Sequence, residues 1–137
     1  MKRTSMIAAL ALASPLLAHA AMTPGLYEYT IKMNMPGGPA MPAQTMQQCL
    51  TAKDVAGNKA FEMPPTKDSN CQIKDLTQTG GQFAYKVACT KPQKMDGTVK
   101  GSHTATGMTM DMTMAMAGAP GPMTQTISAR RVGDCKP

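Results

Sequence analysis

The chain has 137 residues, of which 16% are charged and only 4% are aromatic, and its formal net charge is +6. This length suits one domain with a single core. The 14 lysines and arginines are scattered rather than gathered into a basic stripe, and few aromatic side chains are available for base stacking, so we exclude a nucleic-acid-binding protein.

The first 20 residues have the three parts of a secretory signal peptide. Lys2 and Arg3 are basic, residues 6–17 are mostly apolar, and small residues lead up to Ala20. The apolar run is too short to span a bilayer as an uncleaved anchor, which takes about 20 residues. We therefore predict cleavage after Ala20. The remaining chain, residues 21–137, is expected to be a single β-rich domain without a transmembrane segment, located in the periplasm or secreted.

Residues 25–35 form the first predicted strand, because polar and apolar side chains alternate there. The side chains expected on its apolar face are Tyr27, Tyr29, Ile31, Met33 and Met35. Prolines and glycines in residues 36–42 predict a loop. Residues 44–57 are the one plausible helical stretch: Thr51 and Asp54 can cap a helix, and Gly57 can end it. Residues 58–70 are polar, contain prolines and are predicted to be a loop.

Residues 71–89 are predicted to form a β-hairpin with Gly80 and Gly81 in the turn, where a positive φ costs glycine little. Phe83, Tyr85, Val87 and Cys89 would share one face of its second strand. A register that sets Ile73 opposite Val87 also sets Cys71 opposite Cys89.

Three further strands are predicted at residues 96–106, 107–117 and 123–132, with a turn at 118–122. About six strands joined by short turns indicate a meander. The expected fold class is therefore mainly β: a single antiparallel, strongly curved sheet with one short helix.

All four cysteines follow the predicted cleavage site: Cys49, Cys71, Cys89 and Cys135. An even number of cysteines in a small exported domain indicates two disulfides. No C-x-x-C pair is present, so neither thioredoxin chemistry nor a zinc knuckle is indicated. The hairpin register favours Cys71–Cys89, which leaves Cys49–Cys135, but four cysteines allow three connectivities and the choice stays open.

Methionine occupies every second position of the predicted strand 107–117, at Met108, Met110, Met112, Met114 and Met116. On a strand these side chains share one face. Residues 21–137 contain only twelve Leu, Ile, Val and Phe but thirteen methionines. The share of Leu, Ile, Val and Phe in this segment is thus half of the roughly 20% below which chains tend to be disordered. The main interpretation is therefore that methionine replaces the usual aliphatic residues in the core.

Two other interpretations of the row stay open. If exposed, Met108, Met110, Met112, Met114 and Met116 would form an adaptable apolar face for an apolar ligand, a peptide or an envelope protein. Thioethers also bind Cu(I) or Ag(I), with His103, Met108, Met110 and Met112 as candidate ligands. Because side chains on one strand face stand about 6.6–6.8 Å apart, one ion would need sulfurs from another segment. The candidates for that second segment are Met33, Met35, Met41 and Met123.

The sequence offers little for catalysis. Residues 21–137 contain one histidine, His103, so no Ser–His–Asp set is evident, and paired cysteines cannot act as nucleophiles. Asp111 is expected to face solvent opposite the methionines. Arg130 and Arg131 should point to opposite faces of their strand, so they should not clamp one anion. We predict no enzyme and no cofactor.

Four motifs in order resemble a bacterial family known as domain of unknown function 3617: "PGLYEYTIKMNMPG", "QQCLT", "CQIKDLTQTGGQFAYKVAC" and "SARRVGDC". The resemblance spans about residues 23–135. It implies a small exported protein with a compact β-rich domain and cysteines at these places, and it implies no activity, ligand or catalytic residue. This chain departs from what the family leads us to expect in its density of methionine. We therefore expect a non-enzymatic binding or structural envelope protein of unknown partner, with soft-metal binding as the alternative.

Overall fold

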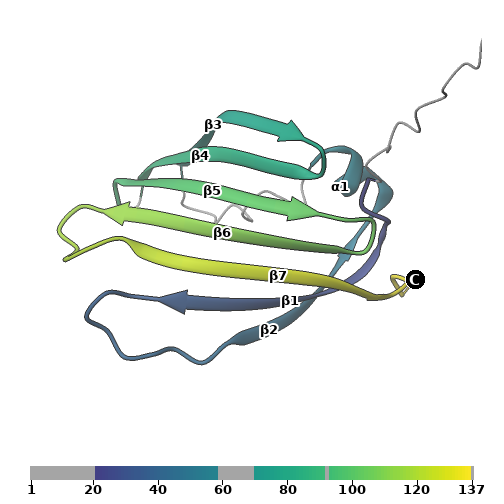
Figure 1. Ribbon diagram of the computed structural model, residues 1–137, viewed down its shortest axis with the longest axis horizontal. Helices are drawn as coiled ribbons and strands as arrows, with labels where there is room; N and C mark the ends of the chain where they lie inside the picture. The colour runs from purple at the N-terminus through teal and green to yellow at the C-terminus, as the bar shows by residue number, and fades with distance from the viewer. Residues whose placement is uncertain (1–20, 59–69, 92, 137) are drawn as a thin grey trace, which may run out of the picture.

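The computed structural model of the protein describes residues 21–58, 70–91 and 93–136. They form one open, antiparallel sheet of seven strands and one short helix (Figure 1). The elements in chain order are β1 (Gly25–Asn34), β2 (Gln44–Leu50), α1 (Ala52–Ala56), β3 (Asn70–Thr79), β4 (Gln82–Lys91), β5 (Met95–His103), β6 (Gly107–Met116) and β7 (Met123–Gly133). The predicted fold class is confirmed, with seven strands instead of about six. The predicted signal peptide, residues 1–20, lies outside the described residues.

The strand order is β2-β1-β7-β6-β5-β4-β3. Strands β3 to β7 form a meander in which each strand pairs with the next, as predicted. The N-terminal strand does not extend this meander from the β3 side: β1 pairs with β7 instead, and β2 lies outside β1. As a result β2 and β3 are the two edge strands of the sheet (Figure 1). The loop predicted at residues 58–70 lies outside the described residues except for its two ends.

The seventh strand, β2, corrects the prediction of a helix over residues 44–57. Its residues pair with β1 without interruption, from Gly25 opposite Leu50 to Ile31 opposite Gln44. Only Leu50 of the seven residues is buried. The backbone hydrogen bonds offered by β1 outweigh the moderate helix propensity of the glutamines, because such propensities are readily overridden by tertiary contacts.

The helical part of the prediction holds for α1 alone. Thr51 caps the helix in a capping box: its hydroxyl accepts a hydrogen bond from the Asp54 N–H at 3.2 Å, and the Asp54 carboxylate accepts one from the Thr51 N–H at 3.0 Å. Gly57 follows the helix as predicted, but its φ of −86° is not left-handed. No helix within the described ranges is long and apolar enough to cross a membrane.

The predicted hairpin is confirmed as β3 and β4. Gly80 and Gly81 have φ of 63° and 75°, which is the backbone that a tight two-residue turn requires. Cys71 lies opposite Cys89 and Ile73 opposite Val87, as in the predicted register. The pairing then shifts by one residue between Lys74 and Thr77.

Both disulfides have the connectivity that this register favours, Cys71–Cys89 and Cys49–Cys135. The first joins neighbouring strands. The second ties the end of β2 to the segment that follows β7, across 86 residues of sequence. Such bridges persist in oxidising compartments, so they indicate that the protein folds outside the reducing cytoplasm.

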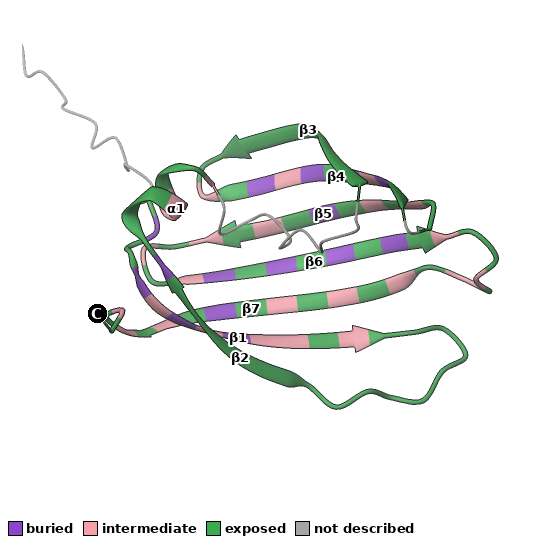
Figure 2. Ribbon diagram, turned by 180° about the vertical axis from the view of Figure 1, so that it is seen from behind, coloured by how far each residue is buried: buried purple, intermediate pink, exposed green. Residues whose placement is uncertain are grey.

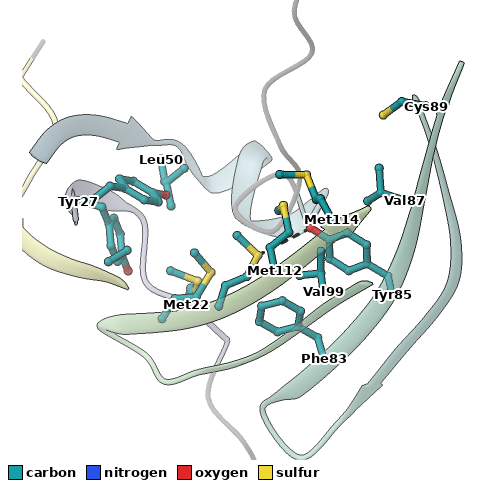
Figure 3. Close-up of a cluster of buried hydrophobic side chains, with 14 residues drawn as sticks. Met22, Tyr27, Leu50, Phe83, Tyr85, Val87, Cys89, Val99, Met112 and Met114 are labelled. Atoms are coloured by element: carbon teal, nitrogen blue, oxygen red, sulfur yellow. Dashed lines mark hydrogen bonds between the residues drawn. The ribbon is translucent and has the colours of Figure 1, made fainter. Parts of the chain in front are cut away.

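One face of the sheet carries the core, and we call it the core face; the opposite, solvent-exposed face is the outer face. The alternation is regular in β6: from residue 108 to residue 115, even-numbered residues are buried and odd-numbered ones are exposed (Figure 2). Side chains from β1, β4, β5 and β6 meet on the core face, and Leu50 lies beside Tyr27 at the end near α1 (Figure 3). No polar or charged residue of the described ranges is buried.

A glycine in β5 leaves room for an aromatic ring on the core face. A Cβ atom at Gly101 would lie 2.4 Å from Phe83 Cζ and 2.5 Å from the Thr109 carbonyl oxygen. We expect Gly101→Ala to lower the free energy of unfolding by about 1–3 kcal/mol, because overpacking forces backbone and side-chain shifts. Urea denaturation measures the change. Gly133→Ala is the matched control, because a Cβ there meets nothing within 4 Å; equal losses in the two variants would contradict this prediction.

Candidate functional site

The methionine row of β6 lies inside the protein. Met108, Met110, Met112 and Met114 are between 1% and 6% exposed, while Met116 at the end of the strand is half-buried. The hydroxyl of Tyr85 donates a hydrogen bond to the Met110 sulfur at 3.8 Å. The burial supports the core interpretation. The alternative interpretation, an exposed ligand face, does not hold for the four residues from Met108 to Met114, because the packing of the core leaves them no access to a partner.

His103 is half-buried at the end of β5, directly opposite Met108 on β6. The predicted neighbourhood of the two residues is therefore present. Met110 and Met112 continue away from His103 along β6 and lie under the core packing. This arrangement does not bring the four candidate ligands His103, Met108, Met110 and Met112 to one accessible point, so it gives no support to a metal site there.

A second group of methionines gathers at the end of the core face farthest from α1. The register sets Met95 of β5 opposite Met116 of β6, and Met114 of β6 opposite Met123 of β7. We call these four residues the distal methionine group. Met123 was a candidate from the sequence, whereas Met95 was not, although its same-face spacing from Val99 in β5 is a signal that could have revealed it.

Asp111 faces solvent, and Arg130 and Arg131 lie on opposite faces of β7, as predicted. Asp111 is exposed on the outer face, where its carboxylate accepts a hydrogen bond from the Thr126 hydroxyl at 2.8 Å. Arg130 donates two hydrogen bonds to one oxygen of Glu28, at 2.6 and 3.1 Å, and this contact lowers the pKa of Glu28. Arg131 donates to the Pro24 carbonyl at 3.0 Å and forms an ion pair with Asp134. The two arginines therefore serve separate partners.

Two tyrosines of β1 keep their protons inside the core. Burial raises the pKa of Tyr27 and of Tyr29. The Tyr27 hydroxyl donates to the Thr23 carbonyl at 2.7 Å and also approaches the Ala105 carbonyl at 3.3 Å. These bonds hold the segment before β1 against the turn between β5 and β6, which is a structural task rather than a chemical one.

Two shallow hollows contain the predicted polar candidates. A hollow of about 280 Å³ near α1 is lined by His103, Gln82, Asn58 and Thr79, among others. The polar groups that line this hollow beside His103 are amides and hydroxyls, which neither accept nor release a proton at neutral pH. A hollow of about 450 Å³ on the outer face contains Asp111 and Lys100, which are a directly opposed cross-strand pair. Neither arrangement assembles a nucleophile with an activating base.

The two edges of the sheet differ in a way that bears on binding. Strand β3 is fully exposed but irregular: its pairing shifts between Lys74 and Thr77, Asp75 has a φ of 54°, and Asp75 forms an ion pair with Lys86 at 3.0 Å. A bulge and charges on an edge hinder the addition of another strand. Strand β2 has no charge, no proline and no shift in its register. This edge could not be expected from the sequence, because residues 44–50 were predicted to be part of a helix.

Strand β2 also exposes an apolar side chain. Met46 is 51% exposed, and its pairing with Tyr29 places it on the core face. No other described strand pairs with the outer side of β2, so this backbone and Met46 together form an open edge of the core face. We call Gln44–Leu50, viewed from the side away from β1, the β2 edge. This is the candidate binding site that the geometry supports best.

Comparison with known proteins agrees with the resemblance noted in the sequence. A family model described as "Protein of unknown function (DUF3617)" matches residues 22–135. No curated protein and no solved structure matches closely enough to compare. The matched region begins three residues before β1 and ends at Cys135 of the long disulfide, so it includes every strand described above. The chain therefore belongs to the DUF3617 family.

Proposed function

We propose that this protein is a non-enzymatic binding protein of the bacterial periplasm, and that it takes up an extended segment of another polypeptide as an eighth strand along the β2 edge. The disulfides support a location outside the cytoplasm, and the signal-like residues 1–20 support export. The observation that carries the proposal is the contrast between the two edges: β3 is bulged and charged, whereas β2 is regular and uncharged.

Strand addition at this edge is favourable for two physical reasons. Every second residue of an edge strand presents its N–H and C=O groups outward, and pairing them contributes about 0.5–1.5 kcal/mol net for each hydrogen bond. Covering the exposed half of Met46 would add about 1 kcal/mol. A partner strand with an apolar residue facing Met46 would gain most, so we expect the bound segment to be extended and partly apolar.

Site-specific photo-crosslinking in the producing cells tests this proposal. A photoreactive amino acid replaces Gln47 on β2 or, as the matched control, Gln72 on β3; both are exposed glutamines on edge strands. We expect a discrete crosslinked species from position 47 and none from position 72. The intact mass of the uncrosslinked protein is read in the same experiment, and we expect a chain that begins at Ala21 with both disulfides formed.

A charge on the edge supplies the decisive comparison. Met46→Lys should abolish the crosslink from position 47, because a lysine on an edge strand opposes strand addition. It should change the free energy of unfolding by less than about 0.5 kcal/mol, since the side chain is exposed. Equal crosslinking at positions 47 and 72, or a crosslink that persists in Met46→Lys, would refute binding at this edge. A product with twice the mass of the protein identifies the added strand as that of a second copy.

A further inference from the structure

The distal methionine group places four thioethers on three adjacent strands. Met95 and Met116 are directly opposite each other, and so are Met114 and Met123. Cβ atoms of opposed residues are about 4.5–5.5 Å apart, and diagonal neighbours are about 7–8 Å apart. A methionine side chain has three rotatable bonds, so sulfurs on this block can reach one common point. We propose that Met95, Met114, Met116 and Met123 form a binding site for a soft monovalent cation, Cu(I) or Ag(I).

A glycine on β5 leaves room for one of these side chains on the side of Met95. Gly97 of β5 lies opposite Met114, and a Cβ atom at Gly97 would be 3.1 Å from Met114 Cγ. The Met114 side chain therefore lies over β5, on the same face as Met95, two residues before Gly97. Side chains on one face of a single strand stand about 6.6–6.8 Å apart, which is too far for them to share one ion. Methionines on the neighbouring strands β5 and β7 supply the closer sulfurs.

The site is accessible and its frame is fixed. Met95, Met116 and Met123 are half-buried, whereas Met114 is only 6% exposed. The Gln93 side-chain amide donates to the Ala117 carbonyl at 3.3 Å, which joins the turn before β5 to the end of β6. The Ala119 N–H donates to the Met116 carbonyl at 3.2 Å and closes the turn after β6. An ion can therefore reach the sulfurs without unfolding the core.

The chemistry of these donors selects the ion. Thioethers are soft, neutral ligands that favour Cu(I) over hard divalent cations. Cys89 lies opposite Met95, but it is bonded to Cys71 and supplies no thiolate. No cluster of histidine, cysteine and carboxylate side chains suited to a metal occurs within the described ranges. Because thioethers do not titrate, binding here should not depend on pH, unlike binding through His103.

Titration with Ag(I), which is stable in air, tests the site directly. The protein is purified with both disulfides formed and with its methionine methyl groups labelled with ¹³C, and silver nitrate is added in buffer without chloride. We expect the methyl signals of the distal methionine group to shift and to saturate together at one ion per chain. The signals of the exposed Met41 and Met46 should not move over that range.

Leucine variants separate the sulfurs from the packing. The triple variant Met95→Leu, Met116→Leu, Met123→Leu keeps apolar side chains of similar volume, so each change should cost less than about 1.5 kcal/mol of stability. We expect it to weaken Ag(I) binding at least about tenfold. The control changes two exposed methionines away from the site, Met41→Leu and Met46→Leu, and should bind as the unaltered protein does. If the triple variant does not fold, Met116→Leu alone is expected to weaken binding measurably.

Three results would overturn the site. The first is the absence of saturable Ag(I) binding, and the second is an equal loss in the distal and control variants. The third is a fall in affinity of about tenfold or more between pH 7.5 and about pH 5, where a histidine becomes protonated, since this would assign the ion to His103. The outcome does not depend on the β2 edge, so the two proposals stand or fall separately.

Discussion

Met112→Ala is expected to lower the free energy of unfolding by about 2–5 kcal/mol, which is the cost of removing a large buried apolar side chain and leaving a cavity. Met112 is 1% exposed in the middle of β6, and its partner on β5, Val99, is equally buried. Since domains of this size are stable by only about 5–15 kcal/mol in total, the variant should lose a large part of its stability. Urea denaturation followed by circular dichroism measures the difference.

Two controls show whether the loss comes from the core. Met112→Leu keeps the volume and should cost less than about 1.5 kcal/mol. Met46→Ala removes an exposed methionine, 51% accessible, and should change stability by no more than about 0.5 kcal/mol. If Met112→Ala lowered the free energy of unfolding no more than Met46→Ala does, methionine side chains would not be the main stabilising residues of this core.

Loss of the long disulfide is expected to have an equally large effect. Cys49 and Cys135 are 86 residues apart, whereas Cys71 and Cys89 are 18 residues apart. In the chain-entropy account, a bridge stabilises by restricting the unfolded chain, and the two loops correspond to about 4.5 and about 3 kcal/mol. The double variant Cys49→Ser, Cys135→Ser should therefore be less stable than Cys71→Ser, Cys89→Ser.

Chemical denaturation of both double variants without reductant measures this order. The long bridge also anchors the outer strand β2, in which only Leu50 is buried. Hydrogen exchange of β2 amides should therefore accelerate in the Cys49→Ser, Cys135→Ser variant more than exchange in β5 or β6. A greater loss on removal of the short bridge would show that restriction of the unfolded chain does not govern the stability of this protein.

Local patterns sufficed for most of the fold. The alternation of side chains located β1, β6 and β7 to within about two residues, and Gly80–Gly81 located the hairpin turn. The pairing of Cys71 with Cys89 depends in addition on the one-residue shift between Lys74 and Thr77. The capping box of Thr51 and Asp54 located the start of α1. These features depend on neighbours in sequence or on one tight turn, which is why sequence reasoning reaches them.

Features set by distant contacts were out of reach. Strand β2 has neither alternation nor β-branched residues beyond Thr45, and it is a strand because β1 is there to pair with it. The placement of β1 beside β7 is likewise a long-range choice. For the candidate sites, the sequence singled out the thioethers of β6 but could not show which are buried, nor that Met95 and Met123 are their cross-strand neighbours.

The pairing of the first strand with the last bears on how the chain matures. Residues 26–34 of β1 bond to residues 124–133 of β7, about a hundred positions later. Contacts this distant in sequence slow folding, because a long loop must close before they form. If the chain emerges from a translocation pore N-terminus first, β1 and β2 lack their partner strand until β7 has emerged. The earliest segment of the chain should stay unstructured, and open to chaperones and proteases, for most of its passage.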